Sequence, residues 1–222
     1  MKEILINAKK SKTNSLMLFA VYFVINFLFL TKYGIRQSLV SLSILIVAFI
    51  IVHGSFFFLR KNQLLAEKIN IRLIYLLTSF FVIVYIGLCH IIKVPYYLNI
   101  DRWQTLDFSL DYWIHGKYIY NTRNFMGNLS SYLPGQLLLA LPAYLLGNVG
   151  YLQVAAFLLF SYAVLLEFKS NLIRFSAILM LGISLSYIYE VVCKSDFISS
   201  FIFVAAFILF WHSKFKGDYF QK

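Results

Sequence analysis

The chain has 222 residues, of which 61% are hydrophobic and 13% are charged, and its formal net charge is +11. Water-soluble domains rarely have this composition, and the long apolar stretches that recur along the chain predict an all-α, polytopic membrane protein. The Lys and Arg residues stand mainly at the ends of these stretches, where contact with headgroups places them. Because no basic, aromatic-rich patch is present, composition argues against nucleic acid as a partner.

Six apolar runs follow one another along the chain, and a membrane crossing needs about 20 such residues. They are Ser15–Leu30, Ser38–Leu59, Leu73–Ile92, Leu133–Leu166, Leu172–Val192 and Phe197–Trp211. The first run follows a basic start and lacks a small-residue cleavage site, so we expect a retained helix and not a signal peptide. The fourth run is too long for one crossing and contains Pro142 and the break Gly147–Gly150. It predicts either two short helices or one crossing preceded by a half-helix.

The distribution of Lys and Arg favours one of two topologies. With six crossings and a cytoplasmic N-terminus, thirteen of the 20 Lys and Arg residues are inside and seven are outside. With seven crossings the same residues divide nine inside and eleven outside. The excess of positive charge on cytoplasmic loops therefore favours six crossings over seven, with both ends in the cytoplasm. We expect a multi-pass protein of a plasma membrane, and the Lys/Asn/Ile/Phe bias favours a bacterial inner membrane.

Both topologies place the same long, less apolar loop outside the cytoplasm. The predicted organisation is three N-terminal membrane helices in residues 1–92, this loop in residues 93–131, and three or four C-terminal membrane helices in residues 132–222. Three carboxylates, those of Asp101, Asp107 and Asp111, gather in the loop directly after the third apolar run. Function often lies in such loops, which a rigid scaffold holds in place.

Within this loop, the pattern from Arg102 to His115 predicts an amphipathic helix that Gly116 ends. Its apolar stripe consists of Trp103, Leu106, Leu110, Trp113 and Ile114, and the two tryptophans favour a position in the plane of the membrane interface. Asp107 and Asp111 are four residues apart and share the polar face. The alternative is that these carboxylates only solvate the helix and that Arg102 neutralises Asp101.

A second polar segment, Tyr187–Asp196, lies at the end of an apolar run and contains Glu190, Lys194 and Asp196. An ionisable residue at membrane depth is a candidate for function. With six crossings this segment lies on the same side as Asp101 and can complete its site, whereas with seven crossings the two lie on opposite sides. The alternative is a Glu190–Lys194 pair, four residues apart on one helix, that satisfies itself.

The order of these motifs resembles the GT-C superfamily of integral membrane glycosyltransferases, which contains the polyprenyl-phosphate-sugar-dependent mannosyltransferases. A membrane helix is followed by Asp101, an amphipathic helix, the G-x-Y-x-Y motif at Gly116–Tyr120, the Tyr-x-Pro motif at Tyr132–Pro134 and the L-x-x-P motif at Leu139–Pro142. The resemblance covers about a quarter of the chain. Members usually have more helices after the loop, so the chain resembles a short or truncated member.

The resemblance implies an enzyme that transfers a sugar from a lipid-linked phosphate donor to a glycan, lipid or protein acceptor. Asp101 would be the general base on the acceptor hydroxyl. Substrate-binding roles follow for a set of residues around it. These residues are Arg102, Lys117 and Lys194 at the donor phosphate, Asp107 and Asp111 at sugar hydroxyls, Tyr118 and Tyr120 against sugar rings, and Glu190 and Asp196 completing the site.

The sequence predicts no particular cofactor. Its four histidines are scattered without metal-ligand spacing, its two cysteines form no metal motif, and Asn99 stands where many members of the superfamily have a second acidic residue. A divalent metal remains an open alternative. Two other functions also remain open: a non-catalytic membrane subunit of a polysaccharide assembly system that works with a partner subunit, and a component of a glycolipid transporter or flippase.

Overall fold

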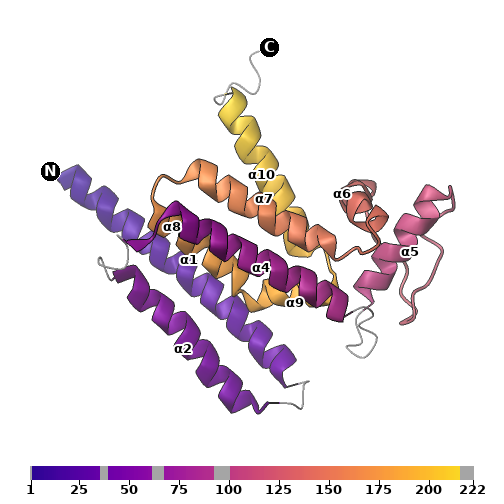
Figure 1. The fold of residues 1–222 in the computed structure, drawn as a ribbon, viewed down its shortest axis with the longest axis horizontal. Coiled ribbons are helices and arrows are strands. Elements are labelled where there is room, and N and C mark those ends of the chain that lie inside the picture. The colour runs from indigo at the N-terminus through magenta and orange to yellow at the C-terminus, as the bar shows by residue number, and fades with distance from the viewer. Residues whose placement is uncertain (1, 36–39, 62–67, 93–100, 216–222) are drawn as a thin grey trace. The chain divides into compact units, whose positions relative to one another are not determined.

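The structure is a computed structural model that describes residues 2–35, 40–61, 68–92 and 101–215, and the side chains of residues 16–35, 40–55, 68–92 and 101–215. These residues form nine helices and no strand (Figure 1). The helices are α1 (Lys2–Gly34), α2 (Leu42–Lys61), α4 (Ile71–Ile91), α5 (Arg102–Ile114), α6 (Pro134–Leu145), α7 (Tyr151–Glu167), α8 (Asn171–Gly182), α9 (Leu185–Cys193) and α10 (Phe197–Phe215). The all-α prediction is confirmed.

The prediction of six or seven crossings is not supported. In the described part of the chain, three helical segments are long and apolar enough to cross a membrane: Leu16–Gly34, Ile71–Ile91 and Phe197–Phe215. The pair α8 and α9, which bends by 50° at its break, makes a fourth if it is one broken crossing. The apolar segments Leu42–Ser55 and α7 are shorter. The composition is therefore that of a membrane protein with three or up to four candidate spans.

Two compact units make up the chain, and the first contains α1 and α2 together with residues 184–186. Its helices pack through aromatic rings, with the Phe23 and Phe49 ring centroids 4.9 Å apart. His53 is buried beside them, where its Nδ1 lies 3.0 Å from the Phe49 carbonyl oxygen and its Nε2 lies 3.3 Å from the Tyr22 hydroxyl. This histidine belongs to the core.

The second unit contains the remaining helices and has two apolar clusters. Residues of α4, α7, α8 and α9 form the larger cluster, in which Tyr85, Phe157 and Tyr187 are almost fully buried. Gly182 lets α8 approach α4 closely, because a Cβ there would overlap the Phe81 ring. The smaller cluster joins α5, α6 and the start of α7.

Helix α5 forms where the periodicity predicts it, and Gly116 follows it with a φ of +66°, a conformation that glycine adopts at no steric cost. Protein covers part of its apolar stripe, whereas Trp113 and Ile114 are exposed. Leu106 and Leu110 are fully buried in the smaller cluster, against α6. The position of α5 in the membrane interface stays a prediction, which the exposed Trp113 and Ile114 leave open.

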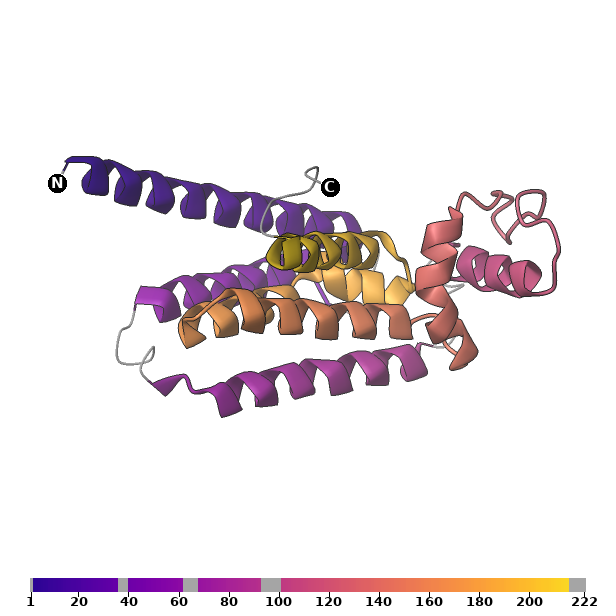
Figure 2. The same cartoon turned by 90° about the horizontal axis from the view of Figure 1, so that it is seen from above.

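The fourth apolar run divides into α6 and α7 at Gly147, whose φ is +87°. Figure 2 shows α6 running across the ends of α4 and α7, with α5 on the far side of α6 from those two helices. Of the alternatives that the sequence left open, two short helices are present, and α6, at 12 residues, is too short to cross a membrane.

Candidate functional site

A cavity of about 390 Å³ lies where four parts of the second unit meet. Its walls come from the end of α4, from α5, from the turn between α6 and α7, and from the turn between α9 and α10. The lining residues are Cys89, His90, Trp103, Asp107, Leu146, Gly147, Asn148, Val149, Tyr151 and Lys194. Two candidate spans, α4 and α10, end and begin here, so the cavity lies at one end of both.

The turn between α6 and α7 is fixed to the end of α4 by side-chain hydrogen bonds. Asn148 donates from Nδ2 to the Cys89 carbonyl oxygen at 3.1 Å and accepts from the Gly150 backbone N–H at 3.0 Å. The Tyr151 hydroxyl lies 2.8 Å from His90 Nε2. A Cβ on Gly150 would lie 2.7 Å from Cys89 Sγ, so this close approach requires glycine.

Lys194 reaches the cavity from a strained turn. Its φ is +50°, which a residue with a Cβ adopts at a cost of about 1–3 kcal/mol unless its surroundings impose it. Here the surroundings do so: Ser195 donates its N–H to the Glu190 carbonyl oxygen at 3.1 Å, and Gln153 donates from Nε2 to the Ser195 carbonyl oxygen. The Lys194 side chain is almost fully buried. A cation is thus held at the cavity wall.

Glu190 makes no ion pair with Lys194 among the interactions described. Its carboxylate instead accepts from the N–H groups of Ile198 and Ser199, at 2.6 and 2.7 Å, and from the Ser199 hydroxyl at 2.6 Å. These N–H groups belong to the first turn of α10, where a negative charge also interacts favourably with the helix dipole. Glu190 therefore caps α10 and stabilises the turn that carries Lys194.

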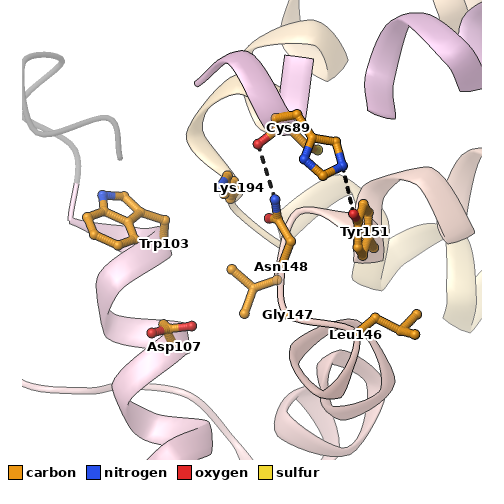
Figure 3. A pocket seen from close by; sticks show the side chains of 10 residues that line it. Cys89, Trp103, Asp107, Leu146, Gly147, Asn148, Tyr151 and Lys194 are labelled. Carbon is orange, nitrogen blue, oxygen red and sulfur yellow. Dashed lines mark hydrogen bonds between the residues drawn. The ribbon is translucent and has the colours of Figure 1, made fainter. Parts of the chain in front are cut away.

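Asp107 and Lys194 share the cavity, with Trp103 and Asp107 on one side and Asn148 and Lys194 on the other (Figure 3). Burial raises the pKa of Asp107, and the neighbouring Asp111 charge raises it further, while Lys194 opposes both. Burial lowers the pKa of Lys194. Burial therefore disfavours the charged form of both groups.

Asp101 does not line the cavity. Its Oδ2 accepts hydrogen bonds from Asn124 Nδ2 at 2.7 Å and from Asn128 Nδ2 at 2.6 Å. Asn124 is buried, and its Nδ2 also donates to Thr105 Oγ1 at 2.8 Å. The carboxylate therefore joins the start of α5 to the loop that follows this helix. The hydrogen-bond partners of its side chain are thus Asn124 and Asn128, and not Arg102.

Asp196 brings the second polar segment to the first. It is buried, and its Oδ2 accepts from Gln136 Nε2 at 3.1 Å and lies 3.5 Å from the Ser200 hydroxyl. Burial raises the pKa of Asp196, and the nearby Arg102 charge opposes this. The seven-crossing topology, which separates the two polar segments, is therefore wrong in this respect.

The other predicted residues lie around α5 and do not line the cavity. Asp111 accepts a hydrogen bond from Tyr144 at 3.3 Å and pairs with His115 at 3.3 Å. Lys117 lies over the Tyr112 ring, Tyr118 is exposed, and the Tyr120 hydroxyl donates to the Tyr132 carbonyl oxygen at 2.9 Å. Of the ten predicted site residues, the cavity brings together Asp107 and Lys194.

Several polar and aromatic residues of the cavity were not among the predicted site residues. These are His90, Trp103, Asn148 and Tyr151. The Gly147–Gly150 break marked a turn, but nothing in its spacing indicated that it meets α4 and α5. In the described part of the chain, no group of three or more His, Cys, Asp or Glu side chains can hold a metal ion.

Comparisons with known proteins identify no relative: no protein-family model, no curated protein and no solved structure matches this chain.

Proposed function

We propose that this chain is a membrane glycosyltransferase that moves a sugar from a polyprenyl-phosphate donor to an extracytoplasmic acceptor, as the resemblance to the GT-C superfamily implies. The observation that carries the proposal is the cavity that holds Asp107 and Lys194 at the end of two candidate spans. Its volume of about 390 Å³ falls within the range of about 300–1,000 Å³ of small-molecule sites. A lipid-linked donor has its phosphate at this depth.

The reaction divides between the two charged groups. The acceptor hydroxyl oxygen attacks the anomeric carbon, the bond from that carbon to the phosphate oxygen breaks, and the lipid phosphate leaves. Asp107 takes the proton of the acceptor hydroxyl, for which a raised pKa suits it. Lys194 balances the charge on the departing phosphate within a partly enclosed site, where electrostatic attraction is stronger than in water.

Asp101 is the other candidate base, as the sequence predicts. In the proposal it serves chiefly to hold the loop, because Asn124 and Asn128 both bind its Oδ2. Arg102 lies near the buried Asp196 and adds positive charge beside the site. The remaining predicted residues serve to hold the conformation of α5, of the loop after it and of the start of α10. They are Asp111, Lys117, Tyr118, Tyr120 and Glu190.

The proposal includes a setting. The loop and the cavity face the outside of a bacterial plasma membrane and the N-terminus lies in the cytoplasm, which requires that α2 crosses the membrane together with the candidate spans in α1 and α4. A second candidate function, a non-catalytic subunit of a polysaccharide assembly system, is favoured by one observation: hydrogen bonding within the loop accounts for Asp101 without any substrate.

The test is the profile of lipid-linked and surface glycans, measured by mass spectrometry in a deletion strain that carries single variants at equal protein level. We expect Asp107→Asn and Lys194→Met to lose the same sugar as the deletion strain. Glu167→Gln, an exposed carboxylate at the other end of α7, is the matched control and should restore the profile.

Each other outcome has a definite meaning. A defect in Asp101→Asn with a normal profile in Asp107→Asn would return the role of base to Asp101. Normal profiles in all three variants, with the deletion strain still defective, would reject the transferase and leave the accessory subunit.

A further inference from the structure

Helix α6 has an unusual composition for a helix at the surface of a protein. Its sequence, PGQLLLALPAYL, contains no charged residue. Its polar side chains are directed at protein groups: Gln136 binds Asp196 and the Leu133 backbone N–H, and Tyr144 donates to Asp111. None of these bonds requires water on the outer side of the helix.

The two sides of α6 differ in burial. Leu137, Ala140 and Ala143 are buried against α5 and α7. The opposite side is apolar and exposed: Leu138 is 59% exposed and Leu145 is 69% exposed. Together with the exposed Pro142, these residues follow the i, i+4, i+7 spacing that places them on one helical face. No described residue covers this face.

The direction of α6 decides between the possible occupants of this face. It runs across the ends of α4 and α7 and is seen end-on in Figure 1 and lengthwise in Figure 2. Since α4 is a candidate span, a helix across its end runs along the membrane surface. An exposed apolar face on a helix with this direction is typical of contact with the boundary between headgroups and acyl chains. Helix α5, whose sequence includes Asp107 and Asp111, lies on the far side of α6 from α4 and α7.

We propose that the bilayer itself covers this face, with Leu138, Pro142 and Leu145 inserted at the boundary between headgroups and acyl chains. Helix α6 is then an interfacial helix of the protein. It sets the depth of the cavity, since Leu146 and Gly147 at its end are part of the cavity wall. The cavity therefore lies at the level of the headgroups.

The test uses the full chain in vesicles of phosphatidylcholine and phosphatidylglycerol, with a single nitroxide spin label on an introduced cysteine. Leu138→Cys and Leu145→Cys place the label on the proposed face, and Asn121→Cys, in the loop after α5, is the exposed control. Collision rates are measured with oxygen, which concentrates in lipid, and with a neutral nickel chelate, which stays in water. We expect oxygen to dominate at positions 138 and 145 and the chelate to dominate at position 121.

Two results would overturn the proposal. If the chelate dominates at positions 138 and 145 as it does at 121, water covers the face. If both reagents are excluded there, a second copy of the chain or another protein covers it. Gly135→Cys provides a further position on the same side, where a Cβ meets nothing within 4 Å, in case either leucine variant fails to fold.

Discussion

Asn124 is the residue on which the loop after α5 most depends, and Asn124→Ala tests this. Its side chain makes four hydrogen bonds: to Asp101 Oδ2 (2.7 Å), to Thr105 Oγ1 (2.8 Å), and from the N–H groups of Met126 and Asn128 (both 3.0 Å). A neutral hydrogen bond contributes about 1 kcal/mol and one to a charged group about 1.5–3 kcal/mol. Because water can replace part of these bonds in an opened loop, we expect a net loss of about 2–4 kcal/mol.

The assay is the rate of trypsin cleavage after Arg123, which lies beside Asn124 and bridges to Leu129 across the loop. When opening and closing are fast, the cleavage rate follows the population of the open loop. A loss of about 2–4 kcal/mol then raises the rate by about 30- to 1,000-fold.

Asn121→Ala is the matched control, since Asn121 is exposed in the same loop. Its cleavage rate should stay within a few-fold of that of the unmodified protein. If Asn124→Ala behaves like Asn121→Ala, the hydrogen bonds of Asn124 do not hold the loop, and the structural role given to Asp101 is refuted with them.

Two further predictions concern the packing and the pH dependence of the second unit. Gly182→Ala should lower the free energy of unfolding by about 1–3 kcal/mol, because the new methyl group overlaps the Phe81 ring. The control is Gly87→Ala, which should be neutral or stabilising because a Cβ there meets nothing within 4 Å. Both are measured by thermal unfolding in detergent. In the same assay, the stability of Asp196→Asn relative to the unmodified protein should increase as pH rises from about 4. Burial raises the folded-state pKa of Asp196 above its unfolded value, so its contribution to stability is highest below the unfolded value and is lost as pH rises through the folded one. A constant difference across pH would contradict this.

Sequence patterns predicted those helices and turns that are determined by residues close together in the chain. The helix at Arg102–His115 was found almost to the residue, because its apolar residues recur at helical spacing and Gly116 follows. The Gly147–Gly150 break was also recognised, since glycine and asparagine mark turns. The predicted six or seven crossings exceed the three or up to four candidate spans of the described residues, because the apolar segments Leu42–Ser55 and α7 are shorter than a span. The residues of α6 are as apolar as those of a span, yet this helix runs across the ends of α4 and α7.

The site was predicted less well, because it depends on contacts between distant segments. Lys194 was singled out for its position near a span, but its approach to Asp107 depends on a strained turn that Glu190 and Gln153 impose. Neither the strain nor the role of Glu190 at the start of α10 can be read from the spacing of the residues. The expected Glu190–Lys194 pair fits the spacing equally well, and only the competition from free N–H groups at a helix N-terminus decides against it.

The three aspartates of the loop are alike in the sequence and differ in the structure. Asp101 is hydrogen-bonded by two asparagine amides, and Asp111 contacts Tyr144 and His115, so both carboxylates have partners within the protein. Asp107 is the one of the three that lines the cavity, opposite a lysine. Asp107 and Asp111 share a face of α5 but lie one helical turn apart. Asp107 therefore lies at the cavity, whereas Asp111 contacts Tyr144 of α6. The carboxylate nearest the span in sequence is therefore not the one that lines the cavity.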